Sequence, residues 1–396
     1  MKRLLNFLSI TLSLIALLSA VWIIIPAPAY ELWLFAVVAS EWSLWLGAIA
    51  LTGAVCSLLV RALYPNGKLW IASLVMGGVA FVIALFPLAS VINLAGEDDV
   101  SLSTKNYFAG LNIFSEKKTN NFTTYTFAQA DGKDLQLDVY LPAENKINNG
   151  ASVIVVHGGS WGAGKRSDFP HWNNWLAAQG FTVFDVDYRL TPQPNYLTAT
   201  GDVKCAVCWI KQHASEFKIS PERIVLLGRS AGGHLALLAA YTADDQRLPS
   251  SCAEKGQNAD VRGVISFYAP TDLIWSYDNP ANQRVINGQE TLAKFLGGSP
   301  HESNEIRERF TLASPVARVS AKTPPTLLIH GGQDQLVRPE NMVRLADRLN
   351  KANVTHKTIY VRYAQHGFDY NFNGWGAQII KFAILTFLLE NTKMNK

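Results

Sequence analysis

The stretch Leu226-Leu227-Gly228-Arg229-Ser230-Ala231-Gly232-Gly233 joins an apolar run to a serine with glycines on both sides. Residues 224–227 are typical of a buried strand, and residues 231–241 are typical of an apolar helix. A serine at a tight strand-to-helix turn has strained backbone angles, and only very small neighbours let such a turn close. A plain Ser-Gly turn is the alternative interpretation. The flanking strand and helix favour Ser230 as a nucleophile at such a turn.

Short apolar runs alternate with helical segments from Phe122 onward. Near-continuous apolar runs are typical of parallel strands buried on both faces. Two antiparallel strands joined at Asp131-Gly132 are predicted to come first. The expected strands are Thr123–Ala130, Leu135–Leu141, Val153–Val156, Phe181–Val186, Ile224–Leu227, Val264–Tyr268, Thr326–Ile329 and Thr358–Tyr363. The alternation predicts an α/β fold with a doubly wound, mostly parallel sheet.

Candidate catalytic residues follow three of these strands. Ligands of doubly wound sheets bind beyond the carboxyl ends of the strands. Asp334 follows the strand at 326–329, and His366 follows the last strand on a glycine-flanked loop. The order Ser230, Asp334, His366 is the nucleophile–acid–base order of one such fold. We expect neutral His366 to accept the Ser230 proton and Asp334 to orient the imidazole.

Other polar residues compete for these roles. Asp272 also follows a strand and is the rival acid, but Asp334 fits the chain order better. His234 lies on the helix after Ser230, where we expect it to pack, and His356 is interpreted as a surface residue.

The strand at 153–156 ends in His157-Gly158-Gly159-Ser160-Trp161. Glycines at this point let backbone N–H groups approach a substrate oxygen without an intervening Cβ. Gly158, Gly159 and the N–H of Ala231 are therefore predicted to form an oxyanion hole, where each donor is worth roughly 3–4 kcal/mol. A plain glycine turn is the alternative. We expect His157 to hold the loop in shape and Trp161 to line the substrate pocket.

A polar, irregular insertion at about residues 275–317 follows the strand at 264–268 and is predicted to form a small cap. Its aromatic residues would either wall an acyl or aryl pocket or form the core of the cap itself. They are Trp275, Tyr277, Phe295 and Phe310.

The N-terminal region is predicted to be a membrane anchor. The chain is 49% hydrophobic and only 17% charged, and the apolar excess lies at its start. Leu4–Ile25, Trp42–Val60 and Leu69–Ala95 are each long enough to cross a bilayer as a helix. Leu32–Ala39 is shorter and is separated from the second span by Glu41, so this region is either one long tilted helix or a surface segment followed by a span.

Charges near the spans predict the orientation. Basic residues precede the first span and lie between the second and third, at Lys2, Arg3, Arg61 and Lys68. The positive-inside rule therefore places the N-terminus in the cytoplasm and the catalytic domain outside it. A signal peptide is the alternative for the first segment, although two more spans follow it. The expected organisation is an anchor at 1–95, a linker at 96–121 and a catalytic domain at 122–396, and the net charge of +4 does not favour nucleic-acid binding.

Cys205 and Cys208 lie one helical turn apart in the predicted helix at 202–213. Without a second Cys or His pair a zinc site is not favoured. In an exported domain we expect one of the two to form a disulfide with Cys252.

Residues from Phe122 to about Glu390 resemble the α/β-hydrolase superfamily, in the bacterial esterase and lipase branch related to hormone-sensitive lipase and kynurenine formamidase. The matching motifs are HGGSW at 157–161, Asp187-Tyr188-Arg189-Leu190, GRSAGG at 228–233, the Asp334 loop and His366-Gly367-Phe368. The hormone-sensitive-lipase pattern has HGGG and an acidic residue before the serine, whereas this chain has Ser160 and Arg229. The resemblance implies neither a metal nor an organic cofactor. For Asp187 and Arg189 we favour a structural role, in which they lock the loop beside the oxyanion hole.

These observations predict a membrane-tethered serine hydrolase that cleaves carboxylic esters of small molecules through an acyl-enzyme intermediate. An amidase or formamidase, or a de-O-acetylase of cell-surface glycans, would use the same triad. The alternative from a different class is a membrane scaffold with an inactive hydrolase fold, and a lost triad residue would mark it.

Overall fold

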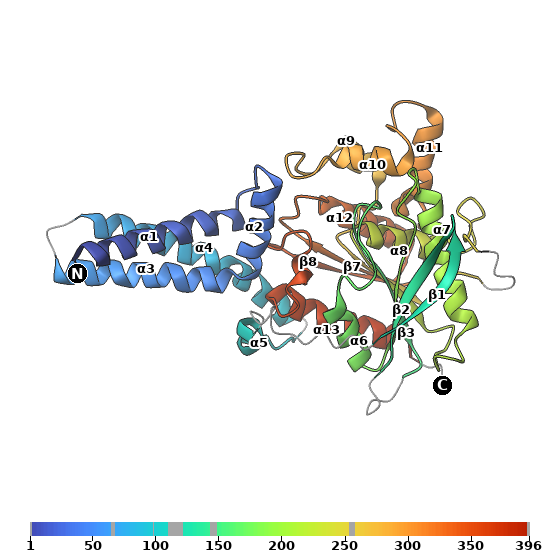
Figure 1. The fold of residues 1–396 in the computed structure, drawn as a ribbon, viewed down its shortest axis with the longest axis horizontal. Helices are drawn as coiled ribbons and strands as arrows, with labels where there is room; N and C mark the ends of the chain where they lie inside the picture. Colours follow the sequence, from blue (N-terminus) through green and yellow to red (C-terminus); the bar gives the residue numbers. More distant parts are fainter. Residues whose placement is uncertain are drawn as a thin grey trace.

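The computed structural model describes residues 2–64, 68–97, 99–109, 122–142, 149–252 and 258–393. It contains an N-terminal bundle of long helices at one end of the molecule and an α/β domain at the other (Figure 1).

The N-terminal region forms four α-helices and one short 3-10 helix. They are α1 (Lys2–Ala20), η1 (Val21–Ile23), α2 (Tyr30–Glu41), α3 (Ser43–Leu63) and α4 (Leu69–Glu97). Three segments, Arg3–Ile23, Ser43–Leu63 and Leu69–Glu97, are long and apolar enough to cross a membrane, as the sequence predicts. The chain breaks at Trp42, so the stretch around Glu41 is two helices and not one long one.

Small residues hold α1, α3 and α4 together. A Cβ added at Gly53 would lie 2.6 Å from Ser13 Oγ, and one at Gly77 would lie 2.9 Å from the Ala50 carbonyl oxygen. Ser9 and Ser13 both hydrogen-bond Ser73 across the bundle. Close packing through small residues and interhelical hydroxyl bonds is the usual way that helices associate in a bilayer, where apolar side chains gain little by leaving lipid.

The stretch expected to be a linker contains a short helix, α5 (Thr104–Ala109). The buried ring of Tyr107 on α5 stacks on Trp375 of α13 (Trp375–Asn391) at 4.4 Å between centroids. Part of the predicted linker is therefore packed against the α/β domain. Residues 98 and 110–121 lie outside the described residues.

The α/β domain is built on an eight-stranded sheet of order β1-β2-β4-β3-β5-β6-β7-β8. β1 and β2 are an antiparallel hairpin, β2 pairs antiparallel with β4, and the other pairs are parallel. The strands are β1 (Thr123–Ala130), β2 (Lys133–Tyr140), β3 (Ser152–Val156), β4 (Thr182–Val186), β5 (Ile224–Arg229), β6 (Gly263–Phe267), β7 (Thr326–Gly331) and β8 (His356–Val361). The predicted fold class, a mostly parallel doubly wound sheet, is confirmed.

Helices cover both faces of this sheet. Alternate strand residues enter different cores, so Leu226 of β5 packs in one cluster and Leu227 in the other. The helices packed against the sheet are α6 (Pro170–Ala178), α7 (Tyr196–Gln212), α8 (Ala231–Tyr241), α12 (Glu340–Lys351) and α13. The cap consists of α9 (Leu273–Asp278), α10 (Gly288–Leu296), α11 (Asn304–Ala313) and η3 (Pro315–Ala317).

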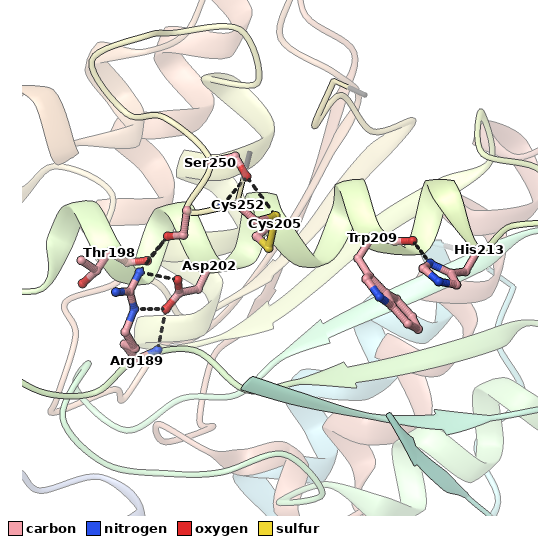
Figure 2. Close-up of a disulfide and its surroundings, with 9 residues drawn as sticks. Arg189, Thr198, Asp202, Cys205, Trp209, His213, Ser250 and Cys252 are labelled. Atoms are coloured by element: carbon pink, nitrogen blue, oxygen red, sulfur yellow. Dashed lines mark hydrogen bonds and ion pairs between the residues drawn. A yellow bond between two sulfur atoms is a disulfide. The ribbon is translucent and has the colours of Figure 1, made fainter. Parts of the chain in front are cut away.

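A disulfide joins Cys205 of α7 to Cys252, with 5.3 Å between the Cα atoms (Figure 2). The sequence left Cys205 and Cys208 as alternatives, and the structure selects Cys205. One helical turn earlier, Asp202 receives hydrogen bonds from the Arg189 guanidinium, which also donates to Ser251 next to Cys252. The disulfide and this ion pair therefore fasten the same loop to α7.

Candidate active site

Ser230 occupies the turn between β5 and α8. Its backbone angles are φ 55° and ψ −121°, in a region that residues other than glycine rarely adopt. The flanking glycines make this turn possible. A Cβ at Gly228 would collide with the Gly232 carbonyl, and one at Gly232 would collide with the carbonyls of Val156 and His157.

The three predicted catalytic residues meet at the carboxyl edge of the sheet. His366 Nε2 lies 2.9 Å from Ser230 Oγ, and His366 Nδ1 lies 2.7 Å from Asp334 Oδ2. Asp334 and His366 are each only 7% exposed. In this arrangement Asp334 accepts from the Nδ1–H of His366, which leaves Nε2 free to accept a proton from Ser230.

Asp334 is oriented by its own loop. Its Oδ1 accepts hydrogen bonds from the backbone N–H groups of Leu336 and Val337, at 2.8 and 2.9 Å. Its Oδ2 also lies 3.2 Å from His330 Nε2. Burial alone would raise the pKa of Asp334, but the imidazoles of His366 and His330 outweigh it and hold this pKa well below its usual range.

The rival acid Asp272 has a different role. Its carboxylate accepts from the backbone N–H of Trp275 and so caps the N-terminus of α9. It also pairs with Arg344 of α12 at 2.7 Å. Asp272 therefore joins the cap to α12 and does not contact His366.

The predicted oxyanion loop lies against the Ser230 turn. A Cβ at Gly158 would lie 3.3 Å from Ser230 Cβ, and Gly159 has φ +117°, where a Cβ would collide with the Ala163 carbonyl. Ala231 is the first residue of α8, and N–H groups at this position have no partner within a helix. Gly158 and Ala231 are therefore adjacent to Ser230, and Gly159 follows Gly158 in the same loop.

Side chains behind the loop hold its shape. The His157 ring stacks on Tyr188 at 4.4 Å, and its Nδ1 lies 2.7 Å from the Gly158 carbonyl oxygen. Arg166 forms ion pairs with Asp187 and with Asp138 of β2. The structure thus ties Asp187 to the segment after HGGSW, while Arg189 acts further away, on Asp202.

A pocket of about 590 Å³, counting its open mouth, adjoins Ser230. Trp161 lines it, stacks on Phe295 at 4.2 Å and donates from Nε1 to His234 Nδ1. The cap aromatics mainly form the core of the cap, because Phe295 and Phe310 are fully buried. The lining residues are Ser160, Trp161, Ser230, Ala231, Pro270, Ser276, Asn279, Pro280, Ala281, Ile286, Gly288, Thr291, Leu292, Leu336, Val337, Arg338 and Asn341.

An ion pair between the Ser230 turn and the loop that carries His366 could not be inferred from the sequence. Arg229, directly before Ser230, is 2% exposed and pairs through Nε with Asp369 Oδ2 at 2.6 Å. Tyr268 donates its hydroxyl to Asp369 Oδ1 at 2.5 Å. The guanidinium lies over the Phe169 ring, 4.0 Å from its centroid. Arg229 thereby joins the Ser230 turn to the loop that carries His366, and its unusual position before the serine was the only signal of this role.

No group of three or more His, Cys, Asp or Glu side chains within the described part of the chain is arranged to hold a metal ion.

Comparisons with known proteins find similarity to esterases and lipases. The chain is 31% identical over 237 residues to esterase LipC of Mycobacterium tuberculosis (strain ATCC 25618 / H37Rv), covering 59% of this chain and 57% of LipC. It is 28% identical to the probable carboxylic ester hydrolase LipM of the same organism, covering 60% of this chain and 54% of LipM. The chain thus spans little more than half the length of these two relatives. It is 32% identical to lipase 2 of Moraxella sp. (strain TA144), covering 69% of this chain and 68% of the lipase.

Among solved structures, the propionate-bound esterase Est2 of Thermogutta terrifontis matches with a TM-score of 0.57 and 25% identity. The match covers 71% of this chain and 98% of Est2. Residues 137–349, more than half of the chain, match the BD-FAE family. The predicted resemblance to α/β-hydrolase esterases is confirmed at this level, and the chain belongs to the BD-FAE family.

Proposed function

We propose that the protein is a carboxylic-ester hydrolase that uses Ser230 as its nucleophile. The observation that carries this proposal is the continuous chain of contacts from Ser230 Oγ through His366 to Asp334. The names of LipC, LipM and the Est2 esterase support the same reaction class.

In the first half of the reaction, Ser230 Oγ attacks the ester carbonyl carbon while His366 Nε2 takes the serine proton. The N–H groups of Gly158, Gly159 and Ala231 stabilise the negative oxygen of the tetrahedral intermediate. The bond from carbon to the alcohol oxygen then breaks, and His366 returns the proton to the departing alcohol.

In the second half, water attacks the acyl carbon and gives one proton to His366. The bond to Ser230 Oγ breaks, His366 returns the proton to the serine, and the carboxylic acid leaves. The Asp334 carboxylate orients His366 and stabilises its positive charge in both halves.

Turnover of p-nitrophenyl acetate by the full chain in detergent tests this proposal. We expect Ser230→Ala to lower kcat by at least about a thousandfold, because the residual rate then depends on the oxyanion hole and binding alone. Ser220→Ala is the matched control. Ser220 precedes β5, so it lies at the opposite edge of the sheet from Ser230.

Undiminished turnover in Ser230→Ala would refute the assignment, and no turnover in the native chain would favour an inactive scaffold. Formamide substrates in the same assay separate esterase from formamidase activity.

For location, we propose a multi-pass membrane protein whose anchor comprises residues 1–95 and whose catalytic domain faces away from the cytoplasm. Three apolar helices of sufficient length support the anchor. The Cys205–Cys252 disulfide supports the orientation, since structural disulfides persist in oxidising compartments. The test is a reporter that functions only in the cytoplasm, fused after Lys396. Activity of this reporter would contradict the proposed orientation.

A further inference from the structure

The helix α2 lies between two membrane-spanning candidates. In the proposed three-span anchor, the first span ends at Ile23 and the second begins at Ser43, so both ends of the intervening segment would lie at the same membrane surface. Figure 1 shows α2 running across the end of the α1, α3 and α4 bundle, between the bundle and the α/β domain. In the proposed anchor, a helix in this position would lie at the membrane surface beside the α/β domain.

One side of α2 exposes large apolar side chains. Leu34 is 46% exposed, Phe35 is 40% exposed and Val38 is 49% exposed. Val38 is four positions from Leu34 and three from Phe35, so the three side chains lie on one face of the helix. The preceding turn adds Ile24 and Ile25, which are also exposed. Exposed large apolar side chains of this kind are unfavourable in water, and the proposed flanking spans would place lipid beside them.

The opposite side of α2 packs on the substrate pocket. Trp33 and Ala27 are buried in a cluster with Val285 of the cap, and Leu336 packs against this cluster. Leu336 also lines the pocket beside Ser230. One pocket wall is therefore backed by the segment that leaves the membrane.

Hydrogen bonds fasten this segment to the catalytic loops. Ala27 donates its N–H to Gln335 Oε1 at 2.7 Å, and Asn282 of the cap donates to the Ala27 carbonyl oxygen at 2.6 Å. Gln335 in turn donates to Gln365 Oε1 at 3.1 Å. Gln335 adjoins Asp334 and Gln365 adjoins His366 in the chain, so the membrane-side segment and the catalytic loops form one buried unit.

We infer that the exposed face of α2 lies in the bilayer interface and holds the pocket at that surface, so that the enzyme acts on ester-bearing amphiphiles dissolved in the membrane. This inference rests on the proposed hydrolase function and adds its substrate class. A substrate that is concentrated in the interface would reach a pocket held at that surface without first crossing bulk water.

The kinetic test compares two substrates of the full chain reconstituted in phosphatidylcholine vesicles. One is a long-chain p-nitrophenyl ester carried in the vesicles, and the other is soluble p-nitrophenyl acetate. For Phe35→Ser combined with Val38→Ser, we expect kcat/KM to fall about tenfold on the vesicle-borne ester and to stay unchanged on the acetate. The matched control is Leu389→Ser, because Leu389 is 50% exposed near the end of α13 that lies far from the bundle (Figure 1).

An equal loss on both substrates would show damage to the pocket and would overturn the inference. No loss on either substrate, or the same loss in the Leu389 control, would overturn it as well.

A second measurement does not depend on turnover. In a Cys56→Ser background, Phe35→Cys and Leu389→Cys each receive an environment-sensitive fluorophore, and nitroxide-labelled lipids serve as quenchers. We expect strong quenching at position 35 and little at position 389. Equal quenching at both positions would overturn the interfacial placement of α2 even if Ser230-dependent turnover is present. If turnover does not depend on Ser230, the proposed mechanism fails independently of the quenching result.

Discussion

Two buried aspartates in this protein lie close to Ser230 in the fold and have different partners. Asp334 contacts the imidazole of His366, whereas Asp369 pairs with the guanidinium of Arg229. An imidazole can take up and release a proton near neutral pH, but a guanidinium stays charged. The first pair is therefore suited to proton transfer, and the second can only hold the two loops together. The partner, and not the degree of burial, separates the carboxylate proposed as catalytic from the structural one.

The largest expected effect separates the two aspartates by rate. Asp334→Asn should lower kcat by about ten-thousandfold, because an amide at this position favours the wrong tautomer of His366. Asp369→Asn should have a much smaller effect on kcat when assayed well below its unfolding temperature. Steady-state kinetics on p-nitrophenyl acetate measures both, and equal losses would contradict the distinction.

The next effect separates the two pairs by stability. Arg229→Met should lower the free energy of unfolding by about 3–5 kcal/mol, because it leaves Asp369 charged and buried without its partner. The double variant Arg229→Met with Asp369→Asn should regain part of this loss, since the uncompensated charge is then gone. Denaturant unfolding of the detergent-solubilised chain measures both variants. A double variant no more stable than the single one would show that the ion pair is not the cause.

A smaller effect tests the hydroxyl that supports Asp369. Tyr268→Phe keeps the ring but removes the O–H donated to Asp369, and should cost about 2 kcal/mol of stability. Because the Tyr268 ring lies 4.3 Å from the His366 ring, the variant also tests whether this contact affects catalysis. We expect kcat to stay within about threefold of the native value, which corresponds to a change of under 1 kcal/mol in the activation free energy. A loss of kcat without a loss of stability would place Tyr268 in the catalytic machinery.

The last effect concerns His234, a fully buried imidazole bonded to Trp161 that is expected to stay neutral. Burial lowers its pKa to about 4, partly offset by its bond to the Ala313 carbonyl oxygen. In the unfolded chain His234 binds a proton more readily than in the folded chain. The stability that the neutral, buried His234 contributes is therefore present above about pH 6.5 and is lost as the pH falls toward 4. In His234→Gln, stability should fall less steeply between pH 6.5 and 4, by up to about 1.4 kcal/mol per pH unit. Parallel slopes in unfolding measured against pH would contradict the assignment.

The fold, and the meeting of Ser230, Asp334 and His366 at one edge of the sheet, could be predicted because they follow from chain order. Parallel strands bring their carboxyl ends to one edge, so residues after β5, β7 and β8 meet there whatever the intervening sequence. Ser230, Asp334 and His366 are such residues. Asp272 follows β6 and meets the same condition, and only the structure shows that it caps α9.

The Arg229–Asp369 pair and the Ala27–Gln335 contact could not be predicted. The first is an ion pair and the second a hydrogen bond, and each joins segments far apart in the chain. No periodicity or motif marks such partners. The choice between Cys205 and Cys208 had the same difficulty, because their directions from α7 depend on how the helix packs on the sheet. The sequence thus predicted which residues follow the carboxyl ends of the strands, but it did not predict the side-chain contacts between distant segments.

The most direct test of the central claim is to find the residue that reacts covalently. A p-nitrophenyl phosphonate transfers its phosphonyl group to an activated serine and releases p-nitrophenol. Mass spectrometry of the digested full chain should find one adduct, on the peptide that contains Ser230, and activity should fall in proportion to labelling. An adduct on another residue, or full activity after complete labelling of Ser230, would contradict the account.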